Sequence, residues 1–215
     1  MDDLQEQTQD KKVMKISDWI FIGVCAFLVV AIFVLRFWWR NEYFGVIVNG
    51  SSMNQTLEHG DELFVRTMKD GVTAERGDVI VVYTGAYSQT GTGNYIIKRL
   101  IAIEGDKVRC TDGKIEICYA GTDVFVALDE PYAYYGSYQQ YYDFAEYQIQ
   151  TGEIFFLGDN RSSSGSSQDS RYQEGHSNLQ CLYKQSDIYG VVPSWSVEYK
   201  SICKLFISKS NVNMQ

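Results

Sequence analysis

The feature that most constrains how this chain can fold is an uncharged apolar run near its N-terminus. Trp19 to Leu35 contains seventeen residues without a charged side chain, and Arg36-Phe37-Trp38-Trp39-Arg40 follows directly. A helix of this length covers about 25 Å, and a snorkelling Arg36 with the two tryptophans extends it to roughly the thickness of a bilayer. Tryptophan and arginine at the end of a span are typical of the membrane interface. The sequence therefore predicts a transmembrane helix over residues 18–40, after an N-terminal tail over residues 1–17.

The alternative for this run is a cleavable signal peptide. Such a peptide usually has a shorter apolar core and ends in small residues, rather than in an aromatic cluster between two arginines. Lys11, Lys12 and Lys15 precede the span, whereas Arg36 and Arg40 follow it. This small excess of positive charge before the span favours a cytoplasmic N-terminus. We therefore expect a single-pass protein of the cell membrane, with the remainder of the chain outside the cytoplasm.

Beyond residue 41 the chain has the alternating pattern of β-strands rather than the period of amphipathic helices. Aromatic residues, which favour strands, make up 14% of the chain. Seven tyrosines between Pro131 and Tyr147 follow no period, and we expect an inserted surface region there. The predicted fold class is mainly β. Strands are expected over residues 44–48, 62–66, 78–83, 96–103, 107–111, 114–118, 153–157 and 188–192, with Asp112-Gly113 as the turn of a hairpin.

The charge balance excludes one large class of partner. The chain has 19 basic and 27 acidic residues, which gives a formal net charge of −8. A protein that binds nucleic acid needs a basic face to displace counterions from the phosphates. Nucleic acid is therefore not an expected partner.

The five cysteines do not have the paired spacing of a zinc site, because no C-x-x-C pair occurs. Cys110 and Cys118 lie on the two arms of the expected hairpin. A two-residue turn places Cys110 opposite Ile115 and Cys118 opposite Lys107, so the two sulfurs are not partners. An extracytoplasmic domain can hold a disulfide. The disulfide state, including a pairing of Cys181 with Cys203, stays open at this point.

Three short segments carry candidate chemistry. Ser52 lies in a glycine-flanked turn after an expected strand, where most serines are only turn residues and some are exposed nucleophiles. Lys98 lies in a strand that is apolar on both faces; it either protects a sheet edge or, if buried, loses its ammonium form. A neutral lysine can take the proton from a serine hydroxyl and replace the histidine of a triad. Residues 158–171 combine acids, arginines and small hydroxyl groups, as in a hydrogen-bonded corner or a flexible serine-rich loop.

Taken in this order, the three segments resemble the type I signal peptidase family, the S26 serine proteases. The resemblance covers the predicted span and most of residues 41–192. The family's nucleophile motif, Ser-Met-x-Pro-Thr-Leu, is similar to residues 52–57 except that Gln55 replaces the proline. The other matching motifs are Gly60-Asp61, Arg76-Gly77-Asp78-Val79-Ile80-Val81, Lys98-Arg99 with Gly105-Asp106, and Gly158-Asp159-Asn160-Arg161 with Ser167 to Arg171.

The resemblance implies a role for each matching residue. Ser52 would be the nucleophile and its backbone N–H an oxyanion donor, Lys98 the neutral general base, and Ser167 the hydroxyl that orients the lysine amine. Asp159, Asp169 and Arg171 would brace the site. The implied activity is endoproteolytic removal of signal peptides from secretory preproteins after Ala-x-Ala-like sites. No metal or organic cofactor is implied, because the serine and the lysine supply both nucleophile and base.

The resemblance also implies a fold and a substrate site. Residues 41–215 would form an extracytoplasmic β-barrel or sandwich domain, with a variable β-rich insertion at about 107–150. The family binds its substrate as an added β-strand with shallow pockets for small side chains. The matching pocket positions are Val48, Gly50, Leu57, Ile96 and Ile97.

The chain departs from the family pattern at three places. Gln55 replaces the motif proline, which loosens the turn but removes no catalytic group. Gly50 stands where some members carry a serine that donates a second hydrogen bond to the oxyanion, so a second donor stays open. The closing loop is three residues longer than the pattern, which makes Ser164 an alternative to Ser167 as the group that orients the lysine.

Two other functions are compatible with parts of the sequence. Ser52, His59 and Asp61 offer the residue types of a Ser-His-Asp triad, although His59 beside a Gly-Asp pair is typical of a surface turn. The chain could also be a signal-peptidase-like membrane protein that binds extended peptides without cutting them. A binding protein has no need for both Ser52 and Lys98, which favours the enzyme.

Overall fold

The computed structural model describes residues 15–69, 71–84, 95–135, 143–162 and 183–207, together with the backbone of residues 212–214. The chain divides into two compact units, Met1–Glu42 and Tyr43–Gln215. The predicted insertion at about 107–150 and the predicted domain limits at residues 17, 40 and 41 stay predictions.

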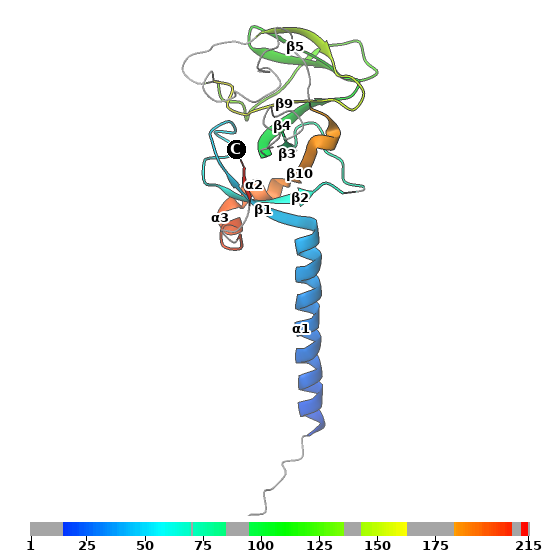
Figure 1. Cartoon of the computed structure of the whole chain (residues 1–215), viewed down its shortest axis with the longest axis vertical. Helices are drawn as coiled ribbons and strands as arrows, with labels where there is room; N and C mark the ends of the chain where they lie inside the picture. Colours follow the sequence, from blue (N-terminus) through cyan, green and yellow to red (C-terminus); the bar gives the residue numbers. More distant parts are fainter. Residues whose placement is uncertain are drawn as a thin grey trace, which may run out of the picture. The chain divides into compact units, whose positions relative to one another are not determined.

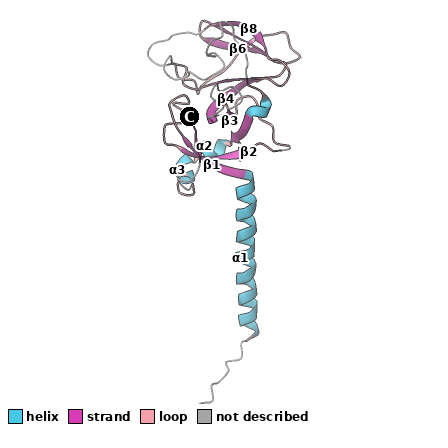
Figure 2. Cartoon of the chain, in the orientation of Figure 1, coloured by secondary structure: helices cyan, strands magenta, loops and turns pink. Residues whose placement is uncertain are grey.

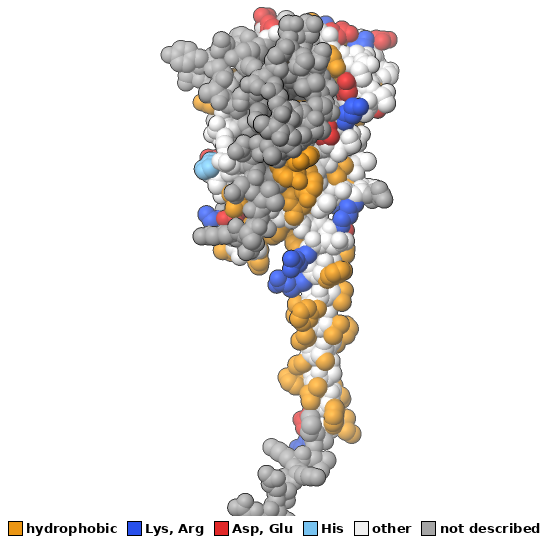
Figure 3. Space-filling model, viewed as in Figure 1, with side chains coloured by type: hydrophobic (Ala, Val, Ile, Leu, Met, Phe, Trp, Pro, Cys, Tyr) orange, Lys and Arg blue, Asp and Glu red, His pale blue; other side chains and the backbone are white. Residues whose placement is uncertain are grey.

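The first unit contains one helix, α1 (Ile16–Glu42), of 27 residues. At 1.5 Å per residue it is about 40 Å long. Its length and apolar composition suffice for one passage through a membrane. Apolar side chains line α1 along its length in Figure 3, and large ones such as Phe21 (69% exposed) and Phe27 (71% exposed) have no protein cover. The helix starts two residues before the predicted span and ends two residues after it.

The second unit consists mainly of strands, which form two sheets (Figure 2). The larger sheet has the strand order β11-β1-β2-β10-β3-β4-β9, and all neighbours are antiparallel except β11 and β1. Six of its strands match predicted ones to within one residue at each end, and β11 was not predicted. The bounds are β1 (Tyr43–Val48), β2 (Glu62–Thr67), β3 (Val79–Tyr83), β4 (Tyr95–Ile103), β9 (Ile154–Leu157), β10 (Ile188–Val192) and β11 (Val212–Met214).

The smaller sheet has the order β7-β6-β5-β8, and Figure 1 shows β5 at the end of this unit away from β1. Its central hairpin turns at Asp112 (φ 50°) and Gly113 (φ 72°), as the Asp-Gly pair predicts. The register pairs Cys110 with Ile115 and Lys107 with Cys118, which confirms the predicted separation of the two sulfurs; neither cysteine is in a disulfide. The bounds are β5 (Lys107–Thr111), β6 (Lys114–Cys118), β7 (Val126–Ala127) and β8 (Phe144–Gln148).

Strand β4 is the centre of the core, because it contributes to all three clusters of buried apolar side chains. Ile97 packs with the ends of β1, β2 and β3, whereas Ile96 and Leu100 pack with β9 and β10. Ile101 and Ala102 pack against the smaller sheet. A strand buried on both faces reads as a nearly continuous apolar run. Lys98 interrupts that run at its centre, although burying a charged side chain among apolar ones is costly.

A buried ion pair joins the two sheets. Asp106, fully buried between β4 and β5, binds Arg76 through two hydrogen bonds of 2.6 and 2.7 Å. The same carboxylate accepts the N–H groups of Ile103 (3.0 Å) and Ala120 (2.9 Å). Hydrogen bonding to Asp106 raises the pKa of Arg76. The family-like pairs Arg76-Gly77 and Gly105-Asp106 therefore meet in space and hold β3 and β4 against the smaller sheet.

Short helices flank β10, one before it and two after it, where the sequence predicted none. Ser196 in α2 accepts a hydrogen bond from the Phe64 N–H (2.8 Å), and Lys200 in α3 binds Asp61 (2.5 Å). These contacts fix both helices against β2. Helices this short have too few turns to produce a periodic apolar pattern. They are η2 (Gln185–Asp187), α2 (Ser194–Glu198) and α3 (Lys200–Cys203).

Candidate active site

Ser52 lies in the loop that follows β1, and it is partly exposed to solvent. Gly50 begins the loop with φ 111°, a backbone conformation that glycine adopts without strain. The loop is closed at its base, because Val48 donates to Asp61 and Gly60 donates to Val48, both at 2.9 Å. Met53 (1% exposed) and Leu57 (fully buried) anchor it in the core. The peptide bond between Asn54 and Gln55, at the position of the family proline, is cis. The result is a serine presented on a short, well-anchored loop.

Lys98 lies in the middle of β4 and is 2% exposed. Strand β4 pairs with β3 on one side and β9 on the other, so Lys98 does not protect a sheet edge and that alternative is wrong. It stands opposite Ile80 in the ladder, and its neighbours Ile96 and Leu100 belong to the same buried cluster as Ile80. Burial in apolar surroundings disfavours an ammonium group. The structure therefore places this lysine inside the sheet, among apolar neighbours.

The segment after β9 holds a fully buried carboxylate, that of Asp159. Arg99, the residue after Lys98, binds it through Nε (2.8 Å to Oδ1) and through a terminal nitrogen (2.5 Å to Oδ2). The Thr56 hydroxyl, from the Ser52 loop, donates to Oδ2 at 2.5 Å. Arg99 also donates to the Gly77 carbonyl at 2.7 Å. Asp159 thus connects the Ser52 loop to the strand that carries Lys98.

Asn160 makes a second connection to the Ser52 loop. Its backbone N–H donates to the Ser52 carbonyl, and its side-chain amide donates to the Ser51 carbonyl, both at 3.0 Å. Its side-chain oxygen accepts the Ser162 hydroxyl (2.5 Å). Three segments that lie far apart in the sequence are therefore joined by hydrogen bonds around one place.

Sequence reasoning identified Asp159 but missed its partners. Thr56, Arg99 and Asn160 stand inside the matching motifs, so the motifs were the signal that could have found them. Glu130 and Tyr132, which contact Arg161 and Arg99, lie in the tyrosine-rich region and carry no motif or period.

The predicted pocket residues fall into different surroundings. Val48, Leu57 and Ile97 pack together in one buried cluster. Ile96 belongs to another cluster, and Gly50 is exposed on the loop. The predicted supporting residues Ser167, Asp169 and Arg171, and the alternative Ser164, lie outside the described residues, as does Cys181.

The groups of the alternative triad have other partners. His59 is exposed, and its Nδ1 accepts the Gly50 N–H at 3.3 Å. The Asp61 carboxylate accepts the Glu58 N–H (2.8 Å) and the Lys200 amine (2.5 Å). In a Ser-His-Asp triad the acid instead accepts the imidazole N–H. This geometry argues against His59 as the base of a triad with Asp61.

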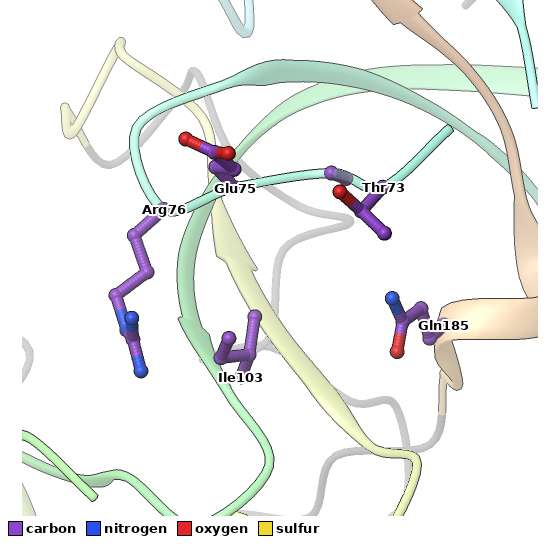
Figure 4. Close-up of a pocket in the computed structure, with 6 residues that line it drawn as sticks. Thr73, Glu75, Arg76, Ile103 and Gln185 are labelled. Carbon is purple, nitrogen blue, oxygen red and sulfur yellow. The ribbon is translucent and has the colours of Figure 1, made fainter. Parts of the chain in front are cut away.

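A separate pocket of about 420 Å³ lies beside the segment that precedes β3 (Figure 4). None of the predicted site residues lines it. The lining residues are Thr73, Ala74, Glu75, Arg76, Ile103 and Gln185.

Comparisons with known proteins identify the family of the chain. Residues 16–197 match the family described as Signal peptidase, peptidase S26. Signal peptidase I P of Bacillus subtilis subsp. natto is 28% identical over 185 residues, which cover 85% of this chain and 90% of that protein. Signal peptidase I of Bacillus amyloliquefaciens is 26% identical over 162 residues, 74% of this chain and 80% of that protein. The crystal structure of a signal peptidase I from Enterococcus faecalis V583 covers 57% of this chain and 98% of that chain, at 23% identity and a TM-score of 0.40. Because the family match runs from the start of α1 into α2, this chain belongs to the S26 family of signal peptidases.

Proposed function

We propose that this protein is a type I signal peptidase, a membrane-anchored serine endopeptidase that uses Ser52 as nucleophile and Lys98 as general base. The observation that carries the proposal is the hydrogen-bonded path from Thr56 through Asp159 to Arg99. It ties the loop of the nucleophile to the strand of the base. Burial makes a charged lysine costly, whereas a neutral lysine amine can serve as a base.

The proposed chemistry has two halves. The Ser52 hydroxyl oxygen attacks the scissile carbonyl carbon while the neutral Lys98 amine takes its proton. The Ser52 backbone N–H stabilises the oxyanion, and the lysine then protonates the leaving amine, so that an ester with Ser52 remains. Lys98 next takes a proton from water, the resulting hydroxide attacks the ester, and the proton returns to Ser52. Ser167 or Ser164 would orient the lysine, and Asp169 and Arg171 would support that hydroxyl.

The proposed substrate is a secretory preprotein that binds in extended form beside β1. The buried cluster of Val48, Leu57 and Ile97 would form the floor of shallow pockets, with Gly50 at their margin. Ile96 belongs to the cluster on the other face of β4 and would not line them. Bulky floor residues leave room only for small side chains, in agreement with cleavage after Ala-x-Ala-like sites. The relatives named above carry the name signal peptidase I.

The proposed location is the cell membrane, with a single passage by α1. The N-terminus would be cytoplasmic and the strand-rich unit extracytoplasmic, because three lysines precede the span and two arginines follow it.

The decisive test is cleavage of a preprotein with an Ala-x-Ala site by the full chain in detergent, with mass spectrometry of the products. Wild type should cut after that site, whereas Ser52→Ala and Lys98→Met should not. Ser201→Ala and Lys107→Ala are matched controls, because Ser201 is exposed and Lys107 is a half-exposed partner of Glu146. If His59→Ala lost cleavage and Lys98→Met kept it, the result would contradict the Ser52–Lys98 pair and favour a Ser-His-Asp triad.

The second candidate function is peptide binding without cleavage. It would be favoured if wild type retained a labelled signal peptide but cut no tested preprotein.

A further inference from the structure

The segment after β7 runs beside the Gly158–Arg161 loop, with Tyr134 paired to Asn160 in parallel. It places Glu130 against Arg161 of the loop and Tyr132 against Arg99 of β4. We propose that Glu130 and Tyr132 are positioning residues for the reaction, holding the Asp159-Asn160-Arg161 loop and Arg99 in the arrangement that presents Ser52 and Lys98 to each other. The proposal rests on the proposed function.

Glu130 is the countercharge of a buried arginine. The Arg161 side chain is 1% exposed and that of Glu130 is 5% exposed. The two terminal nitrogens of Arg161 bind the two oxygens of Glu130 at 2.5 and 3.2 Å, and Nε donates to the Gly158 carbonyl at 2.6 Å. Burial disfavours the charged guanidinium, but the charge and hydrogen bonds of Glu130 outweigh burial and raise the pKa of Arg161. Glu130 therefore keeps Arg161 charged and fixes the turn at Gly158.

Tyr132 links that pair to Arg99. Its hydroxyl donates to Glu130 at 3.2 Å, and its ring lies 3.9 Å from the Arg99 guanidinium carbon. Burial and the charge of Glu130 raise the pKa of Tyr132 well above its usual 10, so the phenol stays neutral. A neutral ring face attracts a guanidinium. Arg99 is thus held by Asp159 and by Tyr132, one residue away from Lys98.

The backbone of the same segment pairs with the loop. Tyr134 donates to the Asp159 carbonyl (2.7 Å), and Arg161 donates to the Tyr134 carbonyl (2.6 Å). Asn160, between these two residues, donates from its backbone N–H to the Ser52 carbonyl. The loop therefore lies between the tyrosine-rich segment and the Ser52 loop, and a shift on one side is transmitted to the other.

These contacts predict that substitutions at Glu130 and Tyr132 lower the rate of catalysis as well as the stability of the fold. A displacement of about 1 Å at reacting groups can lower a rate about 100-fold. In Glu130→Gln we therefore expect kcat to fall about 10- to 100-fold. KM should stay within about 2-fold, because the hydrogen bonds of Glu130 go to Tyr132 and Arg161 and not to a pocket residue. Tyr132→Leu, which removes the ring from Arg99, should lower kcat in the same direction.

The control is Asp106→Asn, which removes another buried carboxylate that pairs with an arginine outside the Gly158–Arg161 loop; that arginine, Arg76, is 34% exposed. Its kcat per folded molecule should stay near that of wild type. A double variant, Glu130→Gln with Arg161→Met, removes the unpaired buried charge and should recover stability without recovering kcat. If Glu130→Gln keeps wild-type kcat per folded molecule, or loses no more than Asp106→Asn, the positioning role is wrong.

Hydrogen exchange separates this proposal from the proposed function. Glu130→Gln should speed amide exchange in residues 158–162 and in residues 50–57, whether or not the protein cuts a preprotein. Unchanged exchange in both segments would overturn the proposal even if wild type is an active peptidase. A wild type that cuts nothing, combined with faster exchange in the variant, would overturn the proposed function. It would still support the role of Glu130 in holding the two loops.

An independent observation concerns β11. Its residues run parallel to β1, with Val46 opposite Val212 and Val48 opposite Met214. The Cα atoms of β11 also lie within 8 Å of those of β4. Strand β1 leads to Ser52 and β4 carries Lys98, so a peptide to be cut must pass between these strands. We infer that β11 occupies the edge of β1 to which the substrate would add as a strand, and that β11 therefore competes with the substrate. This inference too rests on the proposed function.

Proline in β11 tests this competition in the full chain, because proline removes a backbone donor from a ladder. Val212→Pro, Asn213→Pro and Met214→Pro cover the donors on both sides of the strand. A protein whose site is open only part of the time shows weakened apparent affinity, so at least one variant should lower KM about 3- to 10-fold with kcat unchanged. A synthetic peptide of residues 208–215 should inhibit competitively, and its scrambled counterpart should not. Unchanged KM in all three variants would refute the competition.

If the chain cuts no preprotein, the readout is the binding of a labelled signal peptide. Tighter binding by a proline variant would support competition, and equal binding would refute it.

Discussion

Arg99 binds Asp159 side-on, with two nitrogens of one guanidinium on the two oxygens of one carboxylate. The side chains are 11% and 0% exposed. This pair joins the residue next to Lys98 to the segment that holds the Ser52 loop. Charge pairs of this kind fix geometry well, because both donors must be aligned at once.

Asp159→Asn should therefore damage both stability and catalysis. Removing one member of a buried pair leaves the other charge unpaired, which costs about 3–5 kcal/mol. Glu116→Gln is the control, because its pair with Arg109 is 26% and 38% exposed and is expected to contribute at most about 1 kcal/mol. Thermal unfolding in detergent measures the difference. Equal losses in the two variants would contradict a structural role of the Arg99–Asp159 pair.

The pH dependence should follow the lysine. Only the neutral amine can accept the serine proton, so kcat/KM should rise with pH as Lys98 loses its proton, giving an alkaline-side optimum. Lys98→Arg should be inactive at every pH, because a guanidinium stays protonated. A profile that stays flat down to about pH 5 would contradict a lysine base.

Gly190→Ala should destabilise the larger sheet by steric overlap. A Cβ at this position in β10 would lie 2.5 Å from a Val65 methyl and 2.6 Å from the Arg66 carbonyl oxygen. Overpacking of this kind typically costs about 1–3 kcal/mol. Gly121→Ala is the comparison, because Gly121 has φ 80° and nothing within 4 Å of the added carbon, so that variant measures backbone strain alone. A Gly190→Ala protein as stable as wild type would show that β2 and β10 can separate without cost.

Asp143 should stabilise the hairpin turn of the smaller sheet in a pH-dependent way. It accepts the N–H groups of Gly113 (2.9 Å) and Asp112 (3.0 Å), and these hydrogen bonds lower its pKa below the usual 3.8. Because the folded-state pKa is depressed, the contribution is complete above the unfolded-state pKa and is lost as the pH falls through the folded-state value. Asp143→Asn should therefore be less stable than wild type at pH 7, and the gap should close toward pH 3. Thermal unfolding at both pH values is the check, and a gap that is constant with pH would exclude the carboxylate as its origin.

Most strands and the helix were predictable because their patterns are local. Alternation set the bounds of β1, β5, β6 and β10, and the Asp112-Gly113 pair fixed the hairpin register. The Ser52 loop and Lys98 were recognisable because motifs of adjacent residues carry them. The apolar residues around Lys98 left a sheet-edge position and burial both open, and the place of β4 inside the sheet decides for burial.

The remainder depends on contacts between distant residues. Tyr132 meets Arg99 and Glu130 meets Arg161 across gaps of about thirty residues, and no local periodicity records such a pairing. The pairing of β11 with β1 is equally invisible, because three residues are too few to show alternation. The split of Ile96 from Ile97 arises because neighbouring residues of a strand point to opposite faces.

Helix α1 ends at Glu42 and β1 begins at Tyr43, with no linker residue between them. Ser52 is the tenth residue after the helix, and ten fully extended residues span at most about 36 Å. For an enzyme anchored by α1, this tether limits reach: a peptide bond farther than that from the end of the helix is never cut, however strongly its sequence is preferred. Distance from the bilayer then selects the cleavage site together with its small side chains.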